Sequence, residues 1–179
     1  MVYPTMVDLE TLGLDTDSQV LSIGACTFDK DGRILSNFYE VIELGTAPLN
    51  SFNHTPSTVE FWENETEEAK SAIWDHPEKV SMHKALTRLS EWLHPETGMW
   101  ANGTKFDLAK VEYEYKKVGI PVPFKYNSDR CMRTLRKFAG KIDIHYEGIK
   151  HHALHDSIWQ AKYTAAACKK LNLKLLGEM

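Results

Sequence analysis

The chain has 179 residues, of which 42% are hydrophobic and 26% are charged, and its formal net charge is −4 at pH 7. These values are ordinary for a soluble globular protein, and they argue against a broad nonspecific duplex-binding protein, which would need a basic surface. No apolar stretch is long enough to cross a membrane, and the first residues lack the basic and apolar regions of a signal peptide.

The length and the even composition predict a single domain over residues 1–179, because no linker, repeat or low-complexity segment divides the chain. Three cysteines, Cys26, Cys131 and Cys168, lie far apart in the sequence. An odd number of separated cysteines predicts small core residues in a reducing compartment, not a disulfide framework or a zinc cluster. We therefore expect a cytoplasmic protein.

Three apolar segments at the start of the chain predict an antiparallel meander. Residues 5–10 form the first strand, residues 19–28 the second and residues 33–42 the third, with a turn at residues 29–32. A loop is expected over residues 43–56.

The later segments are mostly helical in pattern, with one short strand among them. A capping-box sequence at residues 57–60 predicts a helix start, and a buried strand is expected at residues 99–101. The predicted helices cover residues 57–62, 66–74, 81–93, 106–118, 129–138 and 151–171. Strands followed by helices, with a strand between the helices, predict an α/β protein with a mixed central sheet.

Two acidic residues interrupt the first predicted strand. Asp8 and Glu10 are two positions apart, so on a strand both side chains point to the same face of the sheet. Neighbouring carboxylates repel each other and are costly to desolvate, and a bound cation would relieve both effects. Oxygen ligands of this kind suit Mg²⁺ or Mn²⁺. The alternative is a strand end whose acidic side chains only face water.

Three later residues would complete such a site. Asp107 follows the predicted strand at residues 99–101 and lies at the start of a helix, where α/β folds place ligand sites. His151 and Asp156 fall on the last predicted helix, five residues apart, and are therefore expected on neighbouring faces of it. Ala153, between them, is small enough to let another backbone approach closely.

Together these residues resemble the DEDDh family of 3′→5′ exonucleases, which includes ribonuclease T and oligoribonuclease. The shared pattern is Asp-x-Glu on a first strand, Asp at the start of a middle helix and His-x-Ala-x-x-Asp on a late helix. The resemblance covers nearly the whole chain, and it is closest to the phage Dex-type, exonuclease VIII-type and mycobacterial-type exoribonuclease branches. It is carried by residues 7–13, 20–25, 28–29, 58–62, 101–107 and 151–157, with Phe61 in place of a tryptophan.

The resemblance implies a ribonuclease H-like fold with a mixed five-stranded sheet, of three antiparallel and two parallel strands, flanked by helices. It implies a 3′→5′ exonuclease that hydrolyses single-stranded nucleic acid from its 3′ end and releases nucleoside 5′-monophosphates. Two divalent ions, Mg²⁺ or Mn²⁺, would lie about 4 Å apart and activate the attacking water. The expected ligands are Asp8, Glu10, Asp107 and Asp156, and His151 is the expected general base.

Two further histidines compete with His151 for the role of the base. The family pattern and the five-residue spacing to Asp156 favour His151, whereas His152 and His155 would point elsewhere on the helix. A zinc site made by His151 and His155 is a poorer alternative, because the sequence lacks the Glu and the third soft ligand of zinc hydrolases.

Candidates for substrate contacts lie next to these motifs. They are Thr11, Leu12, Phe61, Trp62, Asn102 and Phe106. Leu12 would wedge against the last base, and the aromatic rings would stack on bases, with core packing as the alternative for Trp62. A basic face would hold phosphates or, as the alternative, would only be solvated. It comprises Arg130, Arg133, Arg136 and Lys137.

Two rival functions stay open: an oligoribonuclease-like enzyme that degrades short RNA, and a catalytically silent nucleic-acid-binding module. The complete set of acidic residues argues against the silent module. No residue identifies a contact to a 2′-hydroxyl, so the residues do not decide between DNA and RNA. The phage-like resemblance slightly favours DNA. The expected partners are 3′ ends of single-stranded DNA or RNA, no membrane, and a second copy of the chain, since dimers are common among relatives.

Overall fold

The computed structural model describes residues 2–45 and 51–175. Its strands are β1 (Thr5–Thr11), β2 (Val20–Phe28), β3 (Ile34–Ile42), β4 (Lys79–Val80), β5 (Met99–Ala101) and β6 (Asp129–Cys131). Its helices are α1 (Pro56–Glu63), α2 (Glu67–Trp74), α3 (Met82–Trp92), α4 (Asp107–Val118), α5 (Met132–Ala139) and α6 (Ala153–Lys170). The α/β class and the mixed sheet predicted from the sequence are confirmed.

The sheet has the strand order β4-β3-β2-β1-β5-β6. The first three strands pair antiparallel as a meander, whereas β4, β5 and β6 each join their neighbour in parallel. The sheet therefore has six strands where five were expected. No segment was predicted at β4 or β6, because segments of two and three residues carry no detectable periodicity.

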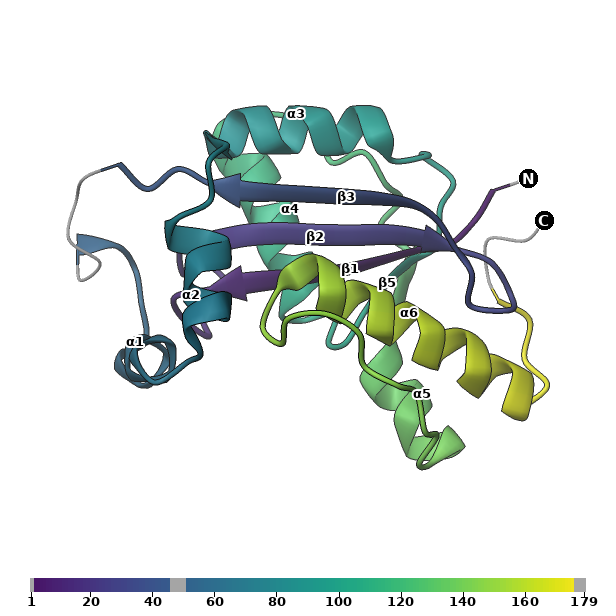
Figure 1. The fold of residues 1–179 in the computed structure, drawn as a ribbon. Coiled ribbons are helices and arrows are strands. Elements are labelled where there is room, and N and C mark those ends of the chain that lie inside the picture. The colour runs from purple at the N-terminus through teal and green to yellow at the C-terminus, as the bar shows by residue number, and fades with distance from the viewer. Residues whose placement is uncertain (1, 46–50, 176–179) are drawn as a thin grey trace.

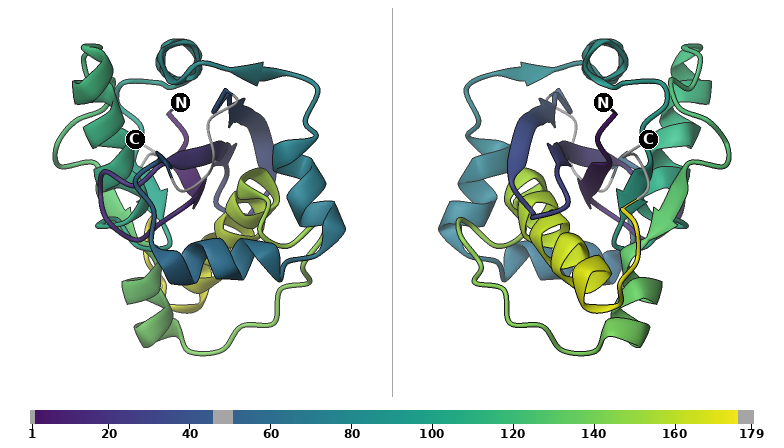
Figure 2. Two further views of the ribbon diagram at one scale, coloured as in Figure 1. Left: turned by 90° about the vertical axis from the view of Figure 1, so that its left-hand side faces the viewer. Right: turned by 90° about the vertical axis from the view of Figure 1, so that its right-hand side faces the viewer.

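Helices cover both faces of the sheet (Figure 1). Alternate residues of β1 divide between the two layers: Val7 and Leu9 pack in a core with α3 and α4, and Met6 packs in a core with α5 and α6. The pair α1 and α2 lies at the end of the sheet where β1 and β3 end and α6 begins (Figures 1 and 2). A third core beneath this pair contains Leu12 and Trp62.

Three predicted helix boundaries are corrected. Helix α1 begins at Pro56 with Thr55 as its N-cap, and no side chain caps it, so the capping box expected from Ser57 is not formed. The segment expected to be helical from residue 129 begins as β6, because its first residues pair with β5. Helix α6 begins at Ala153, two residues later than expected. Part of the expected loop at 43–56, residues 46–50, lies outside the described residues.

One close contact brings α6 onto the sheet. Gly24 on β2 pairs with Asp8 on β1. A methyl group at Gly24 would lie only 2.1 Å from the backbone carbon of Ala153 and 2.2 Å from the nitrogen of Leu154. The first turn of α6 therefore rests directly on the strand, because glycine leaves the space that another side chain would fill. None of the described helices is both long enough and apolar enough to span a bilayer.

Candidate active site

The two acidic residues of β1 face α6. Asp8 and Glu10 lie two and four positions after Met6, which packs against the α5–α6 layer. Because side chains alternate along a strand, both carboxylates point to that same face. Glu10 is only 8% exposed, and Asp8 is half-buried. The side-chain amide of Gln160, on α6, donates a hydrogen bond of 2.7 Å to Oδ1 of Asp8. A side chain of α6, the helix that covers this face, therefore fixes the position of the Asp8 carboxylate.

Asp107 approaches the pair from the neighbouring strand. Strand β5 is parallel to β1, so the turn after Ala101 lies beside the C-terminal end of β1 and leads directly into α4. Asp107 is the first residue of α4 and is 3% exposed. The N–H of Gly103 donates a long hydrogen bond of 3.4 Å to Oδ2 of Asp107, which orients the carboxylate at the sheet edge.

Asp156 completes the set of four carboxylates from the first turn of α6. The hydroxyl of Tyr146 lies 2.8 Å from Oδ1 of Asp156 and 2.8 Å from the carbonyl oxygen of Ile149, and it donates to one of them at a time. Tyr146 thereby ties Asp156 to the segment that precedes α6. Burial raises the pKa of Tyr146, and the neighbouring carboxylate raises it further, so the hydroxyl keeps its proton and remains a donor.

The carboxylates disfavour one another's charge. Burial raises the pKa of Asp8 well above its usual value, and repulsion from Asp107, Glu10 and Asp156 adds to the effect. Burial likewise raises the pKa of Glu10, followed by repulsion from Asp156 and Asp107. The pKa of Asp107 rises to about 7, mainly through burial. Such a cluster is stable in its ionised form only when positive charge is supplied.

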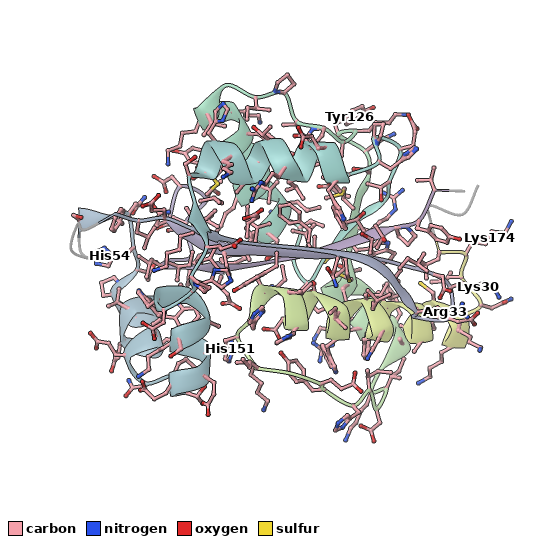
Figure 3. The ribbon with its side chains drawn as sticks, turned by 45° about the horizontal axis from the view of Figure 1, so that its top comes forward. Lys30, Arg33, His54, Tyr126, His151 and Lys174 are labelled. Atoms are coloured by element: carbon pink, nitrogen blue, oxygen red, sulfur yellow. The ribbon has the colours of Figure 1, made fainter. Side chains whose placement is uncertain are left out.

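His151 lies outside the helix, which corrects the expectation that it would share α6 with Asp156. Its backbone is left-handed, with φ of 57°, in the segment that leads into the helix. This conformation brings the ring to the acidic cluster, where ligand atoms of Glu10, His151 and Asp156 all lie within 4.8 Å of one another. Figure 3 shows His151 at the start of α6, facing α1 and α2.

Two residues of the α1–α2 region flank the imidazole. Nε2 of His151 is 3.7 Å from Oε1 of Glu65, and the Phe61 ring meets the His151 ring edge-on at 4.9 Å between centroids. The His151 side chain remains 44% exposed. The ring is therefore oriented by protein groups on two sides and is still open to solvent.

The rings of the other two histidines have different partners. The rings of His152 and His155 stack at 4.1 Å, and His152 also stacks on Tyr39 at 4.3 Å. Nδ1 of His155 accepts a hydrogen bond of 3.0 Å from the N–H of Ile149. Burial lowers the pKa of His152 to about 4, so this ring is neutral near pH 7. His151 and His155 accordingly do not form the pair that a zinc site would need.

The candidate substrate residues divide by exposure. Thr11, Leu12 and Trp62 are 5%, 0% and 3% exposed, and the Trp62 indole donates a hydrogen bond of 2.9 Å to the carbonyl oxygen of Thr11. Core packing, the alternative for Trp62, is what the structure shows. Leu14, two residues beyond Leu12, is 67% exposed and presents an apolar side chain just after β1.

The remaining candidates keep accessible surface. Phe61 is 38% exposed, and Asn102 and Phe106 are half-buried at the turn between β5 and α4. Nζ of Lys110 lies 4.7 Å from the centroid of the Phe106 ring. Lys110 itself is fully buried and donates a hydrogen bond to the carbonyl oxygen of Asp15, which joins α4 to the turn after β1.

Four residues around the site were not predicted from the sequence: Glu65, Tyr146, Gln160 and Leu14. The first three come from segments far from Asp8 and support side chains of the site through contacts that only the folded chain creates. A partial signal existed for Gln160, which is four residues after Asp156 and therefore lies on the same face of α6. A leucine in the turn that follows an acidic strand, such as Leu14, has no distinctive spacing.

A family profile described as the Rv2179c-like 3′-5′ exoribonuclease domain matches residues 4–168. The match includes Asp8, Glu10, Asp107, His151 and Asp156. The chain belongs to this family. The resemblance to DEDDh exonucleases inferred from the sequence is thereby confirmed.

Individual relatives are more distant. The exodeoxyribonuclease of Enterobacteria phage T4 is 24% identical over 119 residues, or 59% of this chain and 52% of that protein. The chain thus spans about half the length of this curated relative. The nuclease domain of 3′hExo, a DEDDh family member solved with rAMP, has a TM-score of 0.62 at 12% identity, with 99% of this chain and 97% of that one covered.

A zinc-bound complex of E. coli ExoI with single-stranded DNA also has a TM-score of 0.62, at 14% identity, covering 96% of this chain and 41% of that one. At such low identity these structures show the fold. It is the ribonuclease H-like fold of the DEDDh exonucleases.

Proposed function

We propose that this protein is a metal-dependent 3′→5′ exonuclease that hydrolyses single-stranded nucleic acid and releases nucleoside 5′-monophosphates. The observation that carries the proposal is the convergence of four carboxylates and one histidine at the end of β1. These groups come from β1, α4, the start of α6 and the segment before it. Membership of a 3′-5′ exoribonuclease family supports the proposal.

The donor set fits hard divalent cations. Asp8, Glu10, Asp107 and Asp156 would hold two ions, because their clustered oxygens have pKa values raised by burial and need positive charge. Oxygen donors favour Mg²⁺ or Mn²⁺ over softer metals. When bound, the ions would supply the acidity that activates water and the charge that neutralises a phosphoryl oxygen.

His151 would accept the proton of the attacking water. Its ring lies beside Glu10 and Asp156 and remains open to solvent, so it can both receive a proton and release it. The Glu65 carboxylate, with Oε1 at 3.7 Å from Nε2, would help to orient the imidazole. Gln160 and Tyr146 would act as positioning residues, since each orients a carboxylate of the cluster.

The terminal nucleotide would lie between the turn after β1 and the turn before α4. Leu14 is proposed as the apolar contact for the terminal base in place of Leu12, because Leu12 is buried and Leu14 is exposed. Phe61 and Phe106 are proposed stacking surfaces, and Asn102 a polar contact. Thr11 and Trp62 would support the turn from beneath it.

Single-stranded DNA is the proposed preferred substrate, in line with the exodeoxyribonuclease relative. Short RNA is the second candidate, and the exoribonuclease description of the family favours it. A homodimer and a cytoplasmic location stay predictions.

The decisive experiment is digestion of DNA and RNA oligomers of one sequence, labelled at either the 3′ or the 5′ end, with Mg²⁺, Mn²⁺ or EDTA. The proposal expects the 3′ label to appear at once as a mononucleotide and the 5′ label to shorten stepwise. EDTA should abolish both signals. Internal cleavage, release from the 5′ end, or full activity in EDTA would contradict the proposal.

Asp8→Asn is the matched inactive variant. It preserves the shape and an oxygen that can accept from Gln160, but it removes one negative charge from the cluster. Turnover should fall by at least about 10²-fold, the scale for loss of a key electrostatic group. Near-normal turnover by this variant would show that Asp8 is not a metal ligand.

A further inference from the structure

A groove runs along the molecule beside the carboxylate cluster. It has a volume of about 700 Å³ and lies between α5, the following segment at residues 140–144, and α6. Figure 1 shows α5 beside α6 on the face of the sheet that carries the candidate site. We call it the basic groove, and the lining residues that matter are Asn102, Arg133, Arg136, Lys137, Lys141 and Trp159.

The charge of the groove is unbalanced. Four cationic side chains line it, against the single carboxylate of Asp143. Among the described residues, no carboxylate forms an ion pair with any of these four cations. Elsewhere on α6, by contrast, Lys162 pairs with Glu147 at 2.6 Å and Lys169 with Asp31 at 3.9 Å. In a protein of net charge −4, this leaves a local concentration of uncompensated positive charge.

The wall of the groove is aromatic and fixed. The guanidinium carbon of Arg136 lies 5.9 Å from the ring centroid of Trp159 and 5.4 Å from that of Tyr163. The Trp159 indole donates a hydrogen bond of 3.0 Å to the carbonyl oxygen of Ile144. Arg136 is therefore spread over rings instead of extending freely into solvent. Cations interleaved with aromatic rings are the usual composition of a surface that follows a single strand of nucleic acid.

The groove reaches the turn that leads to Asp107. Asn102 lines the groove. It is the first residue of the turn between β5 and α4, and α4 begins with Asp107. The backbone N–H of Arg133 donates a hydrogen bond of 3.0 Å to the carbonyl oxygen of Asn102. The Arg133 guanidinium lies against Gly103, where a methyl group would be 3.2 Å from its nitrogen, and its charge acts on Asp107. One end of the groove thus lies next to the turn that carries Asp107.

We propose that the basic groove binds the phosphodiester backbone of the substrate strand on the 5′ side of the bond that is cut. The proposal rests on the proposed exonuclease function. A 3′-terminal nucleotide at the cluster leaves the rest of the strand to cross the surface, where the carboxylates repel its phosphates. The unpaired cations of the groove offer the nearest compensating charge.

The test compares the double variant Lys137→Gln/Lys141→Gln with the wild type on a dinucleotide and on a single strand of about 15 nucleotides. Both lysines are exposed, and both substitutions keep a long polar side chain. The matched control is Lys84→Gln/Lys116→Gln, which removes the same charge from α3 and α4, on the other face of the sheet. Thermal unfolding of all three proteins verifies that they fold alike.

For the long strand, the KM of the groove variant should rise between about 2-fold and 30-fold, the range for losing two exposed charges, with kcat unchanged. Its dependence on salt should flatten by about 0.7 in the logarithmic slope for each lost phosphate contact. Kinetics on the dinucleotide should not change, because so short a substrate does not reach the groove. The control should match the wild type on both substrates.

Failure of this inference is distinct from failure of the proposed function. If the wild type releases no nucleotide from either substrate, the exonuclease proposal fails. If the wild type is active and the groove variant keeps its KM and salt slope on the long strand, the groove is only a solvated face. Equal losses on both substrates would also overturn the inference, because the lysines would then act on the site itself.

Discussion

At the scale of single residues, the histidines show how finely the site depends on local backbone. His151 has a left-handed conformation, and this one residue separates its ring from those of His152 and His155. The two neighbours stack on each other and on Tyr39, whereas His151 joins Glu10 and Asp156. Chemically similar side chains next to one another in sequence are therefore expected to differ widely in their effect on the reaction.

Alanine substitution separates the three histidines. His151→Ala should lower turnover by about 10²–10⁴-fold, the usual contribution of a general base, and should flatten the acid limb of the pH–rate profile. His152→Ala and His155→Ala should cost much less, because their rings do not reach the cluster. The measurement is a pH–rate series at saturating Mg²⁺. A large loss at His155 with little at His151 would reverse the assignment, and small losses at all three would exclude a histidine base.

At the scale of elements, the site depends on how closely helices approach the sheet. Helix α6 carries Asp156 and Gln160, and the space left by Gly24 determines how near they come to β1. On the other face, the buried Lys110 joins α4 to the carbonyl oxygen of Asp15, and so joins the helix of Asp107 to the turn that presents Leu14. Each contact positions one side of the site.

Gly24→Ala tests the first contact. The new methyl group would overlap backbone atoms of Ala153 and Leu154, which cannot move as a flexible side chain does. Overpacking of this kind costs about 1–3 kcal/mol, and the forced shift of α6 should also reduce turnover through Asp156. Thermal unfolding and kinetics with Mg²⁺ measure the two effects. Normal stability together with normal turnover would mean that α6 does not need this close approach.

Lys110→Met tests the second contact. Methionine fills similar space but removes the charged donor to Asp15, so the free energy of unfolding should fall by about 1–3 kcal/mol. Because the turn after β1 loses its link to α4, the KM for substrate should rise more than kcat falls. Lys116→Met, on the exposed side of the same helix, is the matched control. Equal behaviour of the two variants in chemical denaturation and kinetics would refute the bracing role of Lys110.

At the scale of the whole molecule, charge is divided between an acidic site and a basic groove next to it. The net charge of −4 conceals this separation. Repulsion among the carboxylates destabilises the folded protein unless cations bind there. Repulsion among the groove cations does the same unless anions bind there. Metal and a phosphate backbone would each stabilise a different part of the same face.

Stability should therefore depend on pH and metal together. The raised carboxyl pKa values mean that the metal-free folded protein binds more protons than the unfolded chain between about pH 4 and the pKa of Asp107, about 7. The free energy of unfolding should accordingly decrease as pH rises through this window. Tm measured in EDTA should fall from pH 5 to pH 7, and Mg²⁺ should restore it. A Tm in EDTA that rises over this range would contradict the repulsion.

Asp8→Asn provides the control for that measurement. Removing one of the repelling charges should make the metal-free Tm at pH 7 higher than in the wild type, and the gain from Mg²⁺ smaller. The same substitution should thus stabilise the metal-free fold and strongly reduce turnover, a combination that no purely structural role of Asp8 would produce.

The sequence by itself determined the α/β class and predicted the candidate metal ligands. Strand alternation requires Asp8 and Glu10 to share one face, and the strand–turn–helix order around Asp107 places that residue at an edge of the sheet. These conclusions depend only on local geometry, which neighbouring residues dictate. The family pattern identified His151 as well, although it gave the wrong element for it, since a single left-handed residue leaves no trace in periodicity.

Only the tertiary structure decided what surrounds these residues. Glu65, Tyr146 and Gln160 reach the site from separate segments, and their contacts exist only when the chain is folded. Leu12 is buried in a core with Trp62 of α1 and Leu14 is exposed, a difference that only the packing of α1 decides. The short strands β4 and β6 likewise arise from pairing with neighbours that are distant in sequence. Such features depend on packing between residues that are distant in sequence, so no short segment of the sequence is sufficient to predict them.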